Sequence, residues 1–247
     1  YTSYHAIGLP ENIQRDTITQ LAKVSDQGTI TFTDVTGTSQ TISVDSIIYL
    51  SIVNVDTTTP DKNVYMLYSD FCRGWENLYY VNLSGLVDTE IIGSYAFEGC
   101  TNLMEINMTG ANKLRLFYDG VLSNCPSLQS VDFSDVCKTS SRLIIHPNVL
   151  SGCTSLKKIN LSGFKDNTLI YDGFAYNCPN LEEINIGSQD PSKWSITYGK
   201  DYIIANIDPN CQAVTNGIKI VGNNAEAFKT VLPEDTTAGS ITLRHYQ

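Results

Sequence analysis

Four cysteines recur at one position of a repeating pattern, and regularly spaced thiolates are the residues of this chain that could most readily bind a metal. They are Cys100, Cys125, Cys153 and Cys178, with Trp75 at the position of a fifth. Zinc needs its thiolates within about 2.3 Å of one ion, whereas stacked chain turns place equivalent residues in a column about 4.8 Å apart. We therefore predict small buried hydrophobic side chains here, and no metal or cofactor. Cys72, Cys137 and Cys211 lie outside the column, and a disulfide between two of them stays open.

Residues for catalysis are sparse. The three histidines are His5, His146 and His245, and nothing marks a carboxylate–histidine–serine arrangement around any of them. No glycine-rich phosphate loop is present. Paired carboxylates for glycoside hydrolysis stay open, because Asp and Glu are plentiful. A shallow repeat surface nevertheless suits such chemistry poorly, and we predict that the chain is not an enzyme.

The charge of the chain excludes one class of partner. The net charge is −10 with a pI near 4.6, so no basic stripe is available to neutralise a nucleic-acid backbone. An acidic surface first of all favours solubility. No apolar run approaches the ~18 residues that a membrane span needs, so we expect no membrane insertion of this segment.

An internal repeat positions these residues. Five segments align without gaps on the anchor leucines Leu78, Leu103, Leu128, Leu156 and Leu181, which are spaced 25, 25, 28 and 25 apart. Each anchor begins a Leu-x-x-apolar-x-apolar pattern whose last part alternates like a short strand. A second apolar patch precedes each anchor by 11 or 12 residues, as in Ile91 and Ile92. Since one coil cannot bury its apolar face alone, stacked coils must form the core of a solenoid.

A short helical turn is expected between the two extended edges of each coil. Nine residues before the anchors stand Ser69, Ser94, Asp119, Pro147 and Asp172. Serine and aspartate there would accept a backbone N–H at a helix start, and proline suits a first helical position.

The ends of the chain should cap the solenoid. Ile47, Leu50 and Ile52 repeat the strand pattern one coil earlier, and the alternation in 29–35 and 41–44 predicts a β-hairpin. A short helix is a further expectation for 10–24. After Gly187 a loosened coil leads to a helix over 224–231 and a final strand over 240–243. We expect an N-terminal β cap over 1–60 integrated with the repeats of 61–187, followed by a degenerate repeat and C-terminal cap over 188–247.

The segments 96–108 and 149–161, with the core x-F-x-G-C-x-x-L-x-x-I-x-L, resemble the BspA-like leucine-rich-repeat family of bacterial surface proteins. The likeness is good over 64–187 and loose over 202–231, where the strand and helix of 218–231 look like the end cap of such arrays. It implies a β-rich α/β solenoid with a right-handed superhelix of about five full repeats. It also implies a secreted or cell-surface protein with an adhesive role, its signal or anchor removed from this chain.

The outward positions of the predicted strands form a grid. If these strands line the concave face, the grid is the candidate recognition surface. Its residues are Tyr79, Tyr80, Asn82, Met104, Glu105, Asn107, Gln129, Ser130, Asp132, Lys157, Lys158, Asn160, Glu182, Glu183 and Asn185. Tyr79 and Tyr80 would be its anchors, because exposed aromatic residues are common binding hot spots. The alternative is that they fill β-preferring positions or pack under the N-terminal cap.

Two further patterns in the grid can be explained by structural roles alone. The lysine row beside the glutamate row is typical of a surface ion-pair ladder worth about 0–1 kcal/mol per pair. The asparagine column could bridge neighbouring coils by hydrogen bonds and have no role in recognition. Its members are Asn82, Asn107, Asp132, Asn160 and Asn185. We predict a binding module for a protein or glycoprotein partner; a carbohydrate-binding or carbohydrate-processing domain and a structural spacer are the alternatives, and the oligomeric state is undetermined.

Overall fold

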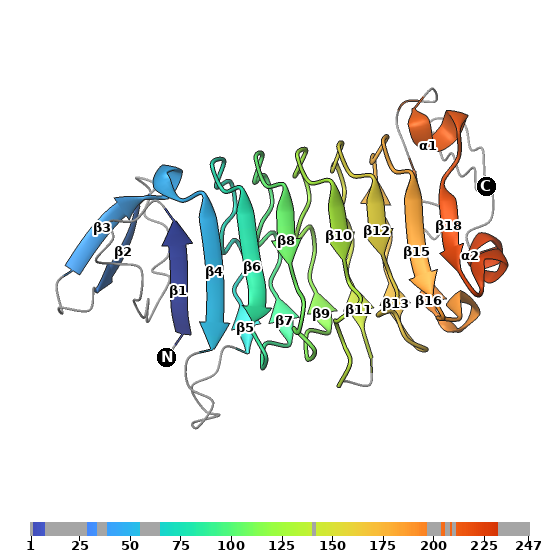
Figure 1. Ribbon diagram of the computed structural model, residues 1–247, viewed down its shortest axis with the longest axis horizontal. Helices are drawn as coiled ribbons and strands as arrows, with labels where there is room; N and C mark the ends of the chain where they lie inside the picture. The colour runs from blue at the N-terminus through green and yellow to red at the C-terminus, as the bar shows by residue number, and fades with distance from the viewer. Residues whose placement is uncertain are drawn as a thin grey trace.

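The chain folds as a β-solenoid of about five turns, with two four-stranded sheets along its front face and one six-stranded parallel sheet along its back face (Figure 1). The computed structural model describes residues 2–7, 29–33, 39–54, 65–139, 142–196, 204–205, 208 and 211–231. The expected helix over 10–24 and strand over 240–243 lie outside these residues. Each anchor leucine of the repeats is fully buried, as the stacked-coil prediction requires.

The front face of the solenoid consists of one strand from each coil. Its strands are β4 (Tyr49–Asn54), β6 (Tyr80–Gly85), β8 (Glu105–Asn107), β10 (Ser130–Asp132), β12 (Lys158–Asn160), β15 (Glu183–Gly187) and β18 (Lys219–Gly222). They follow one another in chain order, and hydrogen-bonded neighbours are parallel, with a register shift in the β4–β6 pair and another in the β15–β18 pair. In the three-residue strands β8, β10 and β12 only the middle residue is buried, and buried and less buried residues alternate in the longer β6 and β15.

The back sheet is formed by the second extended edge of each coil. It consists of β5 (Met66–Leu67), β7 (Ile91–Ile92), β9 (Leu116–Phe117), β11 (Ile144–Ile145), β13 (Leu169–Ile170) and β16 (Ser195–Ile196). All six strands form one continuous parallel sheet. A smaller parallel pair joins β14 (Ala175–Tyr176) to β17 (Ile204–Ala205).

The two ends of the solenoid carry other elements. At the N-terminal end β1 (Thr2–Ile7) pairs antiparallel with β4. There β2 (Thr29–Thr33) and β3 (Ser39–Ser43) form the predicted antiparallel hairpin, and the 3₁₀ turn η2 (Val44–Ser46) leads into β4. Near the C-terminus lie η4 (Pro191–Lys193), α1 (Gln212–Thr215) and α2 (Ala225–Val231). A helix over 224–231 was predicted, and α2 matches it.

The short helix predicted inside each repeat is wrong. Described residues 65–190 contain tight turns there and no helix. Backbone N–H groups of these turns donate to carbonyls of the next coil, as Cys72 does to Ala96 at 2.6 Å and Phe97 does to Val121 at 2.9 Å, and are thus unavailable for a helical ladder. A left-handed residue also follows each expected helix start, and another lies four residues further on. The two columns are Asp70, Tyr95, Gly120, Asn148 and Gly173, then Gly74, Gly99, Asn124, Gly152 and Asn177.

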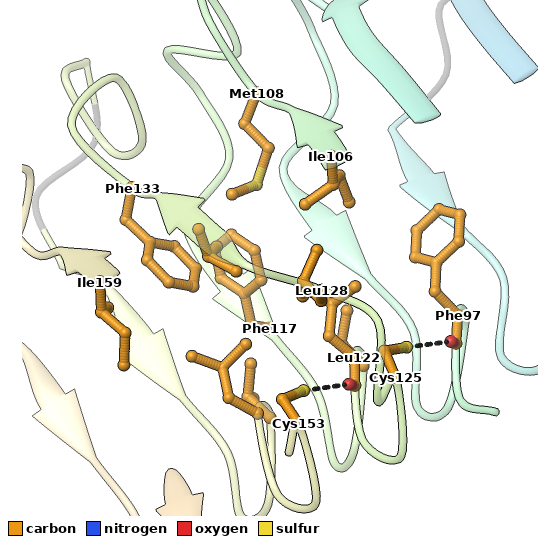
Figure 2. Close-up of a cluster of buried hydrophobic side chains, with 14 of the residues drawn as sticks. Phe97, Ile106, Met108, Phe117, Leu122, Cys125, Leu128, Phe133, Cys153 and Ile159 are labelled. Atoms are coloured by element: carbon orange, nitrogen blue, oxygen red, sulfur yellow. Dashed lines mark hydrogen bonds between the residues drawn. The ribbon is translucent and has the colours of Figure 1, made fainter. Parts of the chain in front are cut away.

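The cysteine column joins the coils through hydrogen bonds (Figure 2). Each thiol donates to a backbone carbonyl of the preceding coil, as Cys125 Sγ does to Phe97 O at 3.1 Å and Cys153 Sγ does to Leu122 O at 3.2 Å. The four thiols are at most 1% exposed, as predicted for small buried hydrophobes. The donor role was not predicted. None of the seven cysteines is in a disulfide, so the disulfide left open by the sequence is not formed.

The thiol column makes stability fall in alkaline solution. Burial raises the pKa of Cys100 and of Cys153 to about 12, whereas an unfolded thiol ionises near pH 8.5. A raised folded-state pKa means that stability is complete below the unfolded value and is lost as the pH rises toward 12. We expect the urea midpoint to fall between pH 8.5 and 11. The Cys100→Ala, Cys153→Ala double variant should lose less over that range, and an equal loss would refute this cause.

Candidate binding surface

The front face presents three outward columns, and every grid residue that the sequence suggested lies in one of them. One column contains Tyr80, Glu105, Ser130, Lys158 and Glu183, which follow one another by strand register except at one break. Another contains Asn82, Asn107, Asp132, Asn160 and Asn185. The third precedes the strands and contains Tyr79, Met104, Gln129, Lys157 and Glu182. The solenoid therefore brings these residues together on one face.

The two tyrosines of the first coil differ in their surroundings. Tyr80 stacks on Tyr49 of the neighbouring strand β4, with ring centroids 4.8 Å apart and planes 15° apart. One face of its ring is thus already covered. Tyr79 is 52% exposed, and it is the aromatic side chain of the grid that is most open to an approaching partner.

The asparagine column lies at the ends of the short strands β8, β10 and β12 and inside the longer β6 and β15. Each side-chain oxygen accepts a hydrogen bond from the backbone N–H two residues later, for example Asn107 Oδ1 from Thr109 at 2.9 Å. Asp132 makes the same turn with Ser134 at 2.8 Å, and the remaining members repeat it. These are Asx turns within one coil, so the suggested bridging by this column is mostly wrong. The exception is Asn82 Nδ2, which donates to Ser51 Oγ at 3.4 Å.

The lysine and glutamate rows form one ion pair. Lys157 Nζ lies 3.7 Å from Glu182 Oε1, and both side chains are about half exposed. A pair of this exposure contributes little to stability, as the sequence indicated.

Two hollows adjoin on the front face, and both are lined by Tyr79 and Met104. One has a volume of about 570 Å³ and extends over Asp45 and Ile48 toward the N-terminal coil. The other, of about 390 Å³, extends over Gln129 and the carboxylates of Glu105, Asp132 and Asp135. Ile48 is 47% exposed, and together with Tyr79 and Met104 it forms an apolar ledge in the lining of the larger hollow.

Comparison with known proteins places this geometry in a family. The BspA type leucine rich repeat region matches residues 66–193 in six copies. The chain belongs to this BspA-type repeat family. The crystal structure of a T. pallidum leucine-rich-repeat protein (TpLRR) is similar at 18% sequence identity, covers 80% of each chain and has a TM-score of 0.46. No curated protein sequence is significantly similar to the chain.

The BspA-type face also contains polar residues that the grid omitted. Asn77, Asn102 and Ser127 occupy the position before each anchor leucine and line the larger hollow. Asn102 Nδ2 donates to Glu76 O at 2.7 Å and Ser127 Oγ donates to Thr101 O at 2.6 Å, so this column bridges successive coils. The recurring Asn or Ser before each anchor leucine was the available sequence signal.

The back sheet of the BspA-type array carries an aromatic stack that sequence reasoning missed. His146 lies between Tyr118 and Tyr171, with ring centroids 4.6 Å and 5.3 Å away and nearly parallel planes. Its Nδ1 lies 3.6 Å from Asp119 Oδ1. These three rings occupy one repeat position, 10 residues before the anchor leucines. They stack on one another along the back sheet.

The described part of the chain has neither a metal-binding cluster nor a membrane-spanning helix. Over these residues no group of three or more His, Cys, Asp or Glu side chains is placed to hold a metal ion. No helix there is long and apolar enough to cross a membrane.

Proposed function

We propose that this protein is a non-enzymatic binding module that captures a protein partner on its front face, with Tyr79 as the anchor. Leucine-rich-repeat modules of this kind are typical of protein–protein interaction. The observation that carries the proposal is the half-exposed Tyr79 at the junction of two adjoining hollows. Tyrosine there offers a large rigid contact area with few rotatable bonds.

A protein partner fits this face better than a carbohydrate. Sugar rings stack on open aromatic faces, whereas one face of the Tyr80 ring is already covered by the ring of Tyr49. The two hollows are broad and open, which suits a protein surface and suits water-excluding catalysis poorly.

The biological setting belongs to the same proposal. We infer a secreted or cell-surface protein with an adhesive role, in keeping with the family resemblance of its repeats. The β1 strand with the β2–β3 hairpin, and β18 with α2, would cap the apolar ends of the core. The coils would form a right-handed superhelix, because parallel β-crossovers are right-handed almost without exception.

Binding of the immobilised chain to purified extracellular-matrix proteins and neutral glycans tests the proposal. We expect saturable binding to a protein, weakened about thirtyfold by Tyr79→Ala, since a hot-spot truncation costs about 2 kcal/mol. Tyr65→Ala is the matched control, because Tyr65 is 58% exposed and lines neither hollow. Binding to glycans alone, or equal losses in the two variants, would contradict the proposal, and no binding at all would favour a structural spacer.

A further inference from the structure

The front face is interrupted at one place, between β8 and β10. Hydrogen-bonded pairing runs from β1 through β4 and β6 to β8, stops, and resumes from β10 through β12 and β15 to β18. The back sheet passes through the same two coils without a break, since β7, β9 and β11 are all paired. The coils therefore stay stacked while their front strands are not bonded to each other.

The interruption leaves main-chain groups without the partners they have in other coils. Met104 N donates to Tyr79 O at 3.0 Å, Lys157 N to Gln129 O at 2.9 Å and Glu182 N to Lys157 O at 2.9 Å. The equivalent bond from Gln129 N to Met104 O is not formed. Both residues line the smaller hollow. A backbone donor and a backbone acceptor at the lining of this hollow thus lack the bond that the other coils make, and a partner's peptide group could supply it.

The side chains around the interruption favour a positively charged group on a partner. Glu105 and Asp132 line this hollow and are exposed, and neither makes an ion pair with any residue of the described chain. Asp135 is already engaged, because it accepts a hydrogen bond from Gly110 N at 2.8 Å and pairs with Lys138. Lys158 is in register with Ser130 on the adjacent strand and bounds the acidic area on one side.

We propose that the hollow at this interruption binds an extended segment of a partner protein that has a large apolar residue close to a basic one. The proposal rests on the proposed function of the front face. The apolar side chain of the segment lies on Tyr79 and Met104 of the apolar ledge. Its lysine or arginine lies between Glu105 and Asp132. Its backbone forms hydrogen bonds with Met104 O and Gln129 N. The chain's net charge of −10 favours the approach of such a segment.

Selection of displayed random heptapeptides on the full immobilised chain tests this proposal. We expect the enriched peptides to share a lysine or arginine near a leucine, phenylalanine or tyrosine. Their affinity should fall about tenfold or more in the Glu105→Gln, Asp132→Asn double variant, as for close charge pairs. The variant should fold normally, since asparagine makes the Asx turn at the other four positions of the Asp132 column. Asp166→Asn is the matched control, because Asp166 pairs with Lys193 elsewhere and is 55% exposed.

The outcomes separate the two proposals. Enriched peptides that need Tyr79 but have no basic residue, or that bind the double variant unchanged, would overturn the charge-specific site and leave the front-face function standing. Peptides that bind the Tyr79→Ala variant as tightly as the original chain would overturn both.

Discussion

Replacing Phe133 by alanine is expected to lower the free energy of unfolding by about 4 kcal/mol, as for other large-to-small changes in a tight core. The Phe133 side chain is fully buried. Its ring centroid lies 5.4 Å from that of Phe117 and 5.6 Å from that of Phe164. Figure 2 shows Phe133 beside Phe117 in the core. Removing the ring leaves a cavity between coils and removes these edge-to-face contacts. Urea unfolding followed by circular dichroism measures the loss.

Phe133→Leu is the control for this prediction. Leucine occupies the equivalent position in two other coils, at Leu83 and Leu161, and both are buried. The leucine variant should therefore lose only about 1 kcal/mol, because most of the volume is kept. Equal losses in the alanine and leucine variants would mean that Phe133 does not fill a packed core.

A single methyl group at Gly163 is expected to destabilise the protein by about 3 kcal/mol, the range seen for overpacking against rigid structure. Gly163 is buried, and a Cβ built there would overlap the carbonyl oxygen of Phe133 and lie 3.2 Å from its carbonyl carbon. Backbone atoms of a stacked coil cannot move aside as a flexible side chain can. The Gly163→Ala variant should have a clearly lower urea midpoint.

Gly74→Ala is the comparison that isolates this steric effect. A Cβ at Gly74 would have no heavy atom within 4 Å, and its only cost comes from a φ of 71°. That left-handed conformation costs a non-glycine residue about 1 kcal/mol. If the Gly163→Ala variant were as stable as the Gly74→Ala variant, the coil of Gly163 would not be in close contact with the backbone of Phe133 in the preceding coil.

The repeat spacing was sufficient to predict the coils, because one apolar pattern in one register leaves a single way to bury the anchor leucines. Leu103 and Leu156 are fully buried. The strand after Leu103 is parallel and in register with the preceding coil, and the strand after Leu156 is parallel and in register with the next one. The turns were predicted wrongly, because Ser94 and Asp119 were interpreted as helix starts. The left-handed Tyr95 and Gly120 follow them directly and prevent the helix.

The candidate site was predictable only as a set of outward positions. Alternation in the strands was enough to indicate that Tyr79, Glu105 and Asp132 share a face. The interruption between β8 and β10 could not be predicted, because the spacing from Leu103 to Leu128 is the regular 25 residues. It depends on main-chain pairing between coils, which side-chain patterns do not determine. The stacking of Tyr80 on Tyr49 could likewise not be predicted, because Tyr49 belongs to the preceding coil.

Hydrogen–deuterium exchange of the full chain, alone and bound to the tightest selected peptide, tests the central claim most directly. In the free protein the Gln129 amide should exchange fast, whereas the bonded amides of Met104 and Lys157 should exchange slowly. The account predicts that the peptide protects Gln129 and the strands on either side of the interruption. Protection confined to the back sheet around His146, with Gln129 still exchanging fast, would contradict it.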